Sequence, residues 1–306
     1  MLLSTPIPSR PAFGGHEKFV FRQGWLKKAI DAAQQDPAVF SKEDAFVHLG
    51  VGKNMAASIR YWGLATGLLE NVLHQRGIRT VIPSALGLAL LGENGFDPYL
   101  EDIGSLWLIH WQLASNRERG LVWHLVFSRY YDVEFRKVQL LQFLKKQMTQ
   151  LAVQTTEGMI EREMDVFLRT YVAAQPKKGL GEEENLDCPL VDLHLLSLSP
   201  SDSVYRFQIG KKPSLPTAIF GYSLLEYLKE KIASQRTVML DECVYQPGSP
   251  GQIFKLDENS VMVYLEDLEV LTNGAIRLQE SAGIRQVYLY QNFPELGMNL
   301  LQAYYE

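Results

Sequence analysis

The most informative side chains for chemistry lie between residues 53 and 62, where the spacing separates an apolar face from a polar one on a predicted helix. At 100° per residue, Met55, Ile59 and Trp62 fall within one narrow arc, which predicts a face packed on a core. The opposite arc carries the residue types that contact phosphates and base edges in recognition helices. These residues are Lys53, Asn54, Ala57, Arg60 and Tyr61.

The flanking residues predict the elements that would position this helix in a winged helix-turn-helix. A short helix over residues 42–49 follows the N-cap candidate Ser41. A tight glycine turn at residues 50–52 then leads into a second helix, from Lys53 to about Glu70. The polar arc described above belongs to this second helix, which would lie against duplex DNA.

Short β-strands are predicted after the second helix and would form the wing. They cover residues 71–75 and 78–82, and the wing would carry Arg76 and Arg79 to DNA, with a packing helix over residues 84–91. Two other interpretations remain open. The polar face could be merely solvated, or the module could bind protein, because a fold does not fix a function.

The distribution of charge indicates which part of the chain could face phosphate. The net charge is −5, but residues 1–90 and 117–150 each carry +4, whereas residues 91–116 carry −4 and residues 151–306 carry −9. A polyanion attracts the basic segments and repels the acidic ones. We therefore expect DNA contact to come from the front half of the chain.

Composition indicates an ordinary soluble protein. The chain has 306 residues and 46% hydrophobic content, enough to bury a large core. It has neither an apolar run of about 18 residues nor the charged start of a signal peptide, so we expect a cytoplasmic protein. The only two cysteines, Cys188 and Cys243, lie outside any CxxC pattern and are expected in the core.

Breaks in the hydrophobic pattern divide the chain into three predicted domains. Residues 1–92 hold an N-terminal arm and the winged helix-turn-helix, residues 93–178 a tryptophan-rich helical middle domain, and residues 179–306 an acidic, winged-helix-like α+β module. The expected fold class is mainly α with small β wings. The helix predicted at 257–271 has five acids and no Lys or Arg, so it is expected to dock a protein or a second copy of the chain.

The segment before and within the first predicted helix could add phosphate contacts. Its cations are Lys18, Arg22, Lys27 and Lys28. Gly14 and Gly15 would let the arm approach a DNA backbone closely. In the alternative interpretation, aromatic side chains around Phe19 and Trp25 anchor the arm on the core, and His16 and Glu17 form only local hydrogen bonds.

Several strings of the sequence resemble one bacterial family. They are FGGHEKFVFRQGWLKK at 13–28, LGVGKNM at 49–55, SIRYW at 58–62, DPYLED at 97–102 and LWLIHW at 106–111. The family they resemble is catalogued as domain of unknown function number four thousand and seven. Its genes lie beside those of cysteine desulfurases and phosphoadenosine-phosphosulfate-reductase-like enzymes of DNA phosphorothioation, a modification that underlies phage defence of the restriction type. The resemblance implies double-stranded DNA and such enzymes as partners.

The sequence holds no catalytic motif, neither a phosphate-binding loop nor a dinucleotide, metalloprotease, serine-hydrolase or nuclease pattern. Cys188, with Asp187, Asp192 and His194 nearby, falls short of the ligands of a structural zinc site. We therefore expect no enzyme and no cofactor. Three functions remain: a DNA-binding accessory protein of a phosphorothioation or related phage-defence system, a homodimeric transcriptional regulator of such an operon, or a protein scaffold without DNA contact.

Overall fold

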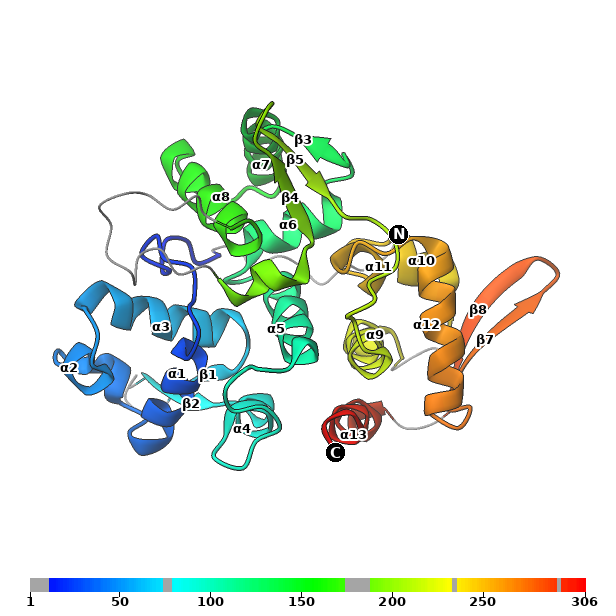
Figure 1. Ribbon diagram of the computed structural model, residues 1–306, viewed down its shortest axis with the longest axis horizontal. Helices are drawn as coiled ribbons and strands as arrows, with labels where there is room; N and C mark the ends of the chain where they lie inside the picture. The colour runs from blue at the N-terminus through cyan, green and yellow to red at the C-terminus, as the bar shows by residue number, and fades with distance from the viewer. Residues whose placement is uncertain (1–10, 74–78, 174–187, 233–235, 291–292) are drawn as a thin grey trace. The chain divides into compact units, whose positions relative to one another are not determined.

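The computed structural model (Figure 1) describes residues 11–73, 79–173, 188–232, 236–290 and 293–306. These residues form a mixed α/β fold in which helices dominate and the sheets are small. The chain divides into two compact units, Met1–Val126 with Glu134–Arg206 and Phe127–Val133 with Phe207–Glu306. This division differs from the three domains expected from the sequence, whose boundaries stay predictions.

The first unit begins with the elements expected around the polar helix. In chain order they are α1 (Trp25–Gln35), the 3-10 turn η1 (Val39–Ser41), α2 (Ala45–Leu49), α3 (Lys53–Ala65), β1 (Leu69–Leu73), β2 (Arg79–Pro83) and α4 (Ala85–Leu91). β1 and β2 are antiparallel, with Leu69 opposite Pro83 and Leu73 opposite Arg79. The order of helix, turn, helix and strand pair is therefore the predicted one.

The end of α3 differs from the sequence prediction. The helix stops at Ala65 rather than near Glu70. Thr66 follows it and donates its hydroxyl to the Trp62 carbonyl at 2.7 Å, and Gly67 then turns with a left-handed φ of 66°. Because glycine adopts this conformation without a steric penalty, the chain leaves the helix there and enters β1.

The remainder of the first unit contains helices packed around aromatic side chains. Its elements are α5 (Ile103–Ser115), the start of α6 (Leu121–Arg129), β3 (Glu134–Phe135), α7 (Lys137–Gln150), α8 (Glu157–Tyr171), the 3-10 turn η4 (Pro189–Leu193), β4 (Leu196–Ser199) and β5 (Val204–Phe207). Trp107 and Trp123 are fully buried, and the ring of Trp123 lies 5.6 Å from that of Trp62 on α3. These tryptophans therefore anchor the core of the first unit.

The second unit contains one small sheet and several helices. After residues 127–133 its elements are α9 (Thr217–Ile232), β6 (Thr237–Met239), α10 (Leu240–Tyr245), α11 (Pro250–Ile253), α12 (Glu258–Leu271), β7 (Ile276–Ser281), β8 (Ile284–Leu289) and α13 (Phe293–Tyr305). The strand order is β6-β8-β7, with both pairs antiparallel. The β7–β8 hairpin projects beside α12 (Figure 1).

Two lysines are buried in the second unit. Lys255 donates to the carbonyls of Phe127 at 2.8 Å and Tyr130 at 3.3 Å, and its Nζ lies 4.5 Å from the centre of the Phe207 ring. Lys212 donates to the carbonyl of Lys255 at 3.1 Å. Burial lowers the pKa of Lys255 to about 7 and that of Lys212 to about 8, because an ammonium ion loses hydration there.

Two simpler expectations concern the cysteines and the membrane. Cys188 and Cys243 are both buried, as the sequence predicted. Within the described part of the chain, no helix combines the length and the apolar character that crossing a bilayer requires.

Candidate nucleic-acid interface

The exposed face of α3 holds three of the five side chains that were predicted on its polar arc. Lys53, Asn54 and Ala57 are exposed, whereas Ile59 and Trp62 on the opposite face are fully buried. Arg60 is half-buried, and its Nη2 donates to Oδ1 of Asn71 on β1 at 3.3 Å. The beginning of α3 therefore presents a cation, an amide and a small residue to solvent, with a second cation held beside the strand pair.

Tyr61 is a correction to the sequence prediction, because its side chain is only 5% exposed. Its hydroxyl donates to the Arg119 carbonyl at 2.6 Å, and its ring meets the His16 ring edge-on at 5.4 Å. Burial raises the pKa of the Tyr61 phenol well above its ordinary value. The arm and the α5–α6 connection cover this part of α3, so Tyr61 belongs to the core.

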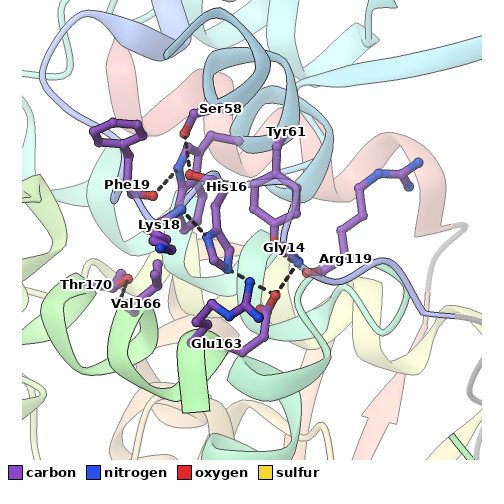
Figure 2. Close-up of polar contacts among 12 residues, drawn as sticks. Gly14, His16, Lys18, Phe19, Ser58, Tyr61, Arg119, Glu163, Val166 and Thr170 are labelled. Carbon is purple, nitrogen blue, oxygen red and sulfur yellow. Dashed lines mark hydrogen bonds and ion pairs between the residues drawn. The ribbon is translucent and has the colours of Figure 1, made fainter. Parts of the chain in front are cut away.

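The arm is fixed to the core by a polar cluster around His16 (Figure 2). His16 Nε2 lies 3.0 Å from the Glu163 carboxylate on α8, and both side chains are at most 2% exposed. Gly14 donates its amide to the same carboxylate oxygen at 2.6 Å, and Ser58 on α3 donates its hydroxyl to the His16 carbonyl at 3.0 Å. The cluster therefore joins the arm to two helices.

The sequence prediction for His16 was only partly correct. One bond is local, because the Lys18 amide donates to His16 Nδ1 at 3.1 Å. The contact with Glu163 is not local, and neither the spacing nor the type of these residues predicts it. The sequence prediction did not identify Glu163 as a buried carboxylate on α8. The apolar residues around it on the helix, Ile160, Met164 and Phe167, are the pattern that indicates that Glu163 faces inward.

The four cations predicted to assist the interface lie in different environments. Lys18 is exposed, and its carbonyl accepts a bond from Arg169 at 2.5 Å. Lys27 pairs with Asp31 at 2.5 Å, and Lys28 donates to the Leu49 carbonyl at 2.8 Å. Arg22 is only 8% exposed and stacks its guanidinium over aromatic rings, which we consider below.

The predicted wing is described only in its strands. Arg76 lies outside the described residues. Arg79 begins β2, paired with Leu73, but its side chain also lies outside the description. The two strands follow α3 directly in the chain, and Asn71 on β1 contacts Arg60.

The acidic helix of the second unit contrasts with α3. α12 begins at the N-cap Asp257, whose carboxylate accepts from the Ser260 amide at 2.8 Å. The Ser260 bonds lower the pKa of Asp257, which keeps this carboxyl ionised. Glu266 and Asp267 are exposed on the same helix. This surface is anionic, as expected for a helix that does not meet DNA.

The residues around Cys188 do not converge. Cys188 is buried, whereas Asp192 and His194 are exposed, and Asp187 lies outside the described residues. Across the ranges that the structure describes, no three His, Cys, Asp or Glu side chains come together as a metal-binding group would require.

Comparison with known proteins decides the family. The model of a family described as "Protein of unknown function (DUF4007)" matches residues 13–305. The chain belongs to this family. Two solved structures are similar to this DUF4007 member, one described as "SspB crystal structure" and one as "Magnesium ion-bound SspB crystal structure". Both are 30% identical to it, with TM-scores of 0.86 and 0.85, and each match covers 96% of this chain and 88% of the other. No curated protein matches the chain.

Proposed function

We propose that this DUF4007 protein is a double-stranded-DNA-binding accessory protein of a bacterial DNA phosphorothioation or related phage-defence system. The observation that carries the proposal is α3, which follows a helix and a tight glycine turn and presents Lys53, Asn54 and Ala57 to solvent. In this proposal the antiparallel β1–β2 pair that follows α3 serves as the wing of a winged helix-turn-helix. The biological setting, beside the genes of DNA phosphorothioation, is the one that the family resemblance implies.

In this proposal the start of α3 meets the duplex. Lys53 supplies a point charge for a phosphate, and Asn54 offers both a donor and an acceptor to a base edge. Arg60, oriented by Asn71, adds a second cation on the side of the strand pair. Phosphate contacts position a protein, while the side chains that reach base edges give sequence preference.

In this proposal the first unit binds DNA and the second unit binds protein. Its acidic helix α12 is repelled by DNA and suits a basic surface on a partner protein. Under this proposal the partners are the cysteine desulfurase and the phosphoadenosine-phosphosulfate-reductase-like enzymes of the same system, and the protein brings them to DNA without itself being an enzyme.

The decisive test is a charge reversal on α3 with a matched control. In a mobility-shift assay on duplex DNA, the double variant Lys53→Glu and Arg60→Glu should bind at least about tenfold more weakly, because each lost phosphate contact weakens the electrostatic term. The control, Lys211→Glu with Lys229→Glu, changes the net charge equally at two exposed lysines of the second unit. Equal weakening by both variants would mean that net charge alone lowers the affinity and that α3 does not contact the DNA.

A plasmid-cleavage assay tests the expected lack of catalysis. One similar structure is described as magnesium ion-bound, so supercoiled plasmid is incubated with the protein with and without Mg²⁺. An accessory protein leaves the plasmid supercoiled in both cases. Conversion to open-circular or linear DNA that requires the protein would overturn the non-catalytic part of the proposal. In a separate footprinting experiment, protection of paired half-sites upstream of the protein's own gene would favour a transcriptional regulator instead.

A further inference from the structure

An open groove of about 780 Å³ lies in the first unit where α1, α2 and α3 meet. Its walls include Arg22, Lys28, Gly24, Gly50 and Gly52, and none of the residues that line it is acidic. Added Cβ atoms at Gly24, Gly50 and Gly52 would meet nothing within 4 Å, so the backbone itself is accessible on this side. The groove is thus cationic and open to a small ligand.

Arg22 is a buried cation with no anionic partner. Its side chain is only 8% exposed, and its guanidinium carbon lies 5.2 Å from the centre of the Trp25 ring and 5.7 Å from that of Phe19. Within the described ranges, its guanidinium makes no hydrogen bond and no ion pair. Ring faces stabilise a cation only partly, and a buried charge is unfavourable unless an opposite charge or acceptors complete it. The guanidinium is therefore arranged to receive an anion.

Two helices begin at this groove, and the second of them, α3, has its first amide groups open. α1 starts after Gly24 and α3 after Gly52, and neither glycine can cap the helix with a side chain. Neither helix has an acidic residue in its first turn. In the described structure, the amides of Lys53, Asn54 and Met55 have no acceptor, as expected for the uncapped first turn of a helix. Open amides and the positive end of the helix dipole favour an oxyanion.

We propose that this groove binds one phosphate oxyanion, held by Arg22, Lys28 and the open amides at the start of α3. Arg22 supplies a planar fork of donors and Lys28 a second positive charge. The proposal deepens the DNA-binding function proposed above and rests on it for the source of the ligand, which is a backbone phosphate of the duplex. A free phosphate ion has the same chemistry, and the experiment separates the two sources.

The test uses two nearly isosteric substitutions at Gly52. Its φ of −68° and ψ of 156° are accessible to any residue, so both Gly52→Asn and Gly52→Asp should fold and cap α3. Asn leaves the site neutral, whereas Asp places a carboxylate where the phosphate would lie. A third variant, Arg22→Met, keeps an apolar chain against Trp25 but removes the cation.

The first arm measures the melting temperature against inorganic phosphate, with sodium chloride at equal ionic strength as the reference. The wild type should gain stability with phosphate beyond the chloride reference, as a ligand that binds only the folded state requires. Gly52→Asn should keep the part of this gain that comes from Arg22 and Lys28, because its side chain occupies one of the open amides of α3. Gly52→Asp and Arg22→Met should lose that gain. No phosphate-specific gain in the wild type, or an equal gain in Gly52→Asp, overturns the anion site.

The second arm measures duplex binding by the same variants. Gly52→Asp should bind at least about tenfold more weakly than Gly52→Asn, and its salt dependence should be shallower by about one phosphate, a slope change of about 0.9. If phosphate stabilises the protein as expected while both Gly52 variants bind DNA equally, the anion site stands with a free ion as its ligand. If the wild type binds no DNA at all, the proposed function fails and the phosphate arm alone decides the site.

Discussion

Glu163 is the residue on which the position of the N-terminal arm depends most. Its carboxylate accepts from the Gly14 amide, and the same oxygen lies 3.0 Å from His16 Nε2 in a contact that is not aligned as a hydrogen bond. Because His16 Nδ1 accepts from the Lys18 amide, the imidazole proton is on Nε2, toward the carboxylate. Removing this buried carboxylate would leave the Gly14 amide without its acceptor and His16 Nε2 without its polar neighbour.

Glu163→Ala should therefore destabilise the protein by about 2 kcal/mol or more in urea unfolding, from the loss of a carboxylate that two buried groups share. Glu163→Gln keeps an oxygen for Gly14 and should cost clearly less. Glu161→Ala on the same helix removes an exposed carboxylate and serves as the control. Equal losses for Glu163→Ala and Glu161→Ala would show that the cluster does not hold the arm.

Lys255 makes stability depend on pH in the second unit. Its carbonyl and ring contacts favour the ammonium form, but burial outweighs them and lowers its pKa to about 7. The unfolded lysine keeps its ordinary pKa of about 10.4. The cost of burying the charge is thus fully present below pH 7 and is relieved as pH rises from about 7 to about 10.4.

Between pH 7 and pH 9 the wild type should gain up to about 2.7 kcal/mol relative to Lys255→Met, because each pH unit in this window contributes at most about 1.4 kcal/mol. The free energy of unfolding of both proteins in urea at the two pH values measures this difference. Lys211→Met, at an exposed neighbouring position, should show no such change relative to the wild type. A pH-independent difference between the wild type and Lys255→Met would mean that the lysine stays charged in the fold.

At the scale of the elements, local patterns in the sequence were sufficient to predict α3 and the strand pair. The spacing of Ile59 and Trp62 gave the buried side of the helix, and the glycines at 50 and 52 gave the turn before it. The buried side is wider than the spacing suggested, because Tyr61 and Ser58 meet the arm and the α5–α6 connection. Each of those contacts joins two residues that are far apart in the sequence, by 42 positions in one case and by 58 in the other. The periodicity within one helix does not predict such contacts.

The fit between the arm and α3 depends on a glycine. A Cβ added at Gly15 would lie 2.6 Å from Cδ2 of Tyr61, on a ring that is packed from several sides. Gly15→Ala must therefore shift either the arm or the helix, whereas the unhindered Gly158, in the first turn of α8, can accept the same methyl group.

Gly15→Ala should lower stability by about 1–3 kcal/mol, the usual effect of overpacking, and should speed tryptic cleavage after Lys18 because the arm is held less firmly. Gly158→Ala should be neutral or stabilising by up to about 1 kcal/mol, since alanine favours the helix. Urea unfolding and limited proteolysis measure the two effects. Unchanged cleavage of Gly15→Ala would show that the packing of Gly15 on Tyr61 does not restrain the arm.

At the scale of the whole molecule, the proposed function requires the protein to bind a polyanion although its net charge is −5. Charges act mainly within a Debye length, which is about 10 Å at 0.1 M salt, so the local surface decides. On the proposed interface, Lys53 and Arg60 belong to α3, and Arg22 and Lys28 line the groove beside it. The acidic surface of α12 contributes little to binding, but it disfavours approach of the duplex from its own side.

The salt dependence of duplex binding measures how many of these cations meet phosphate. If Lys53 and Arg60 each meet one phosphate and Arg22 and Lys28 share a third, a plot of log affinity against log salt concentration should have a slope of about −2.7, at about 0.9 per neutralised phosphate. Lys53→Glu with Arg60→Glu should reduce its magnitude by about 1.8, and Lys211→Glu with Lys229→Glu should leave it unchanged. Glu266→Lys on α12 should likewise keep the slope of the wild type. A steeper slope in that variant would mean that α12 lies against the DNA, and the separation of a DNA-facing first unit from a protein-facing second unit would be wrong.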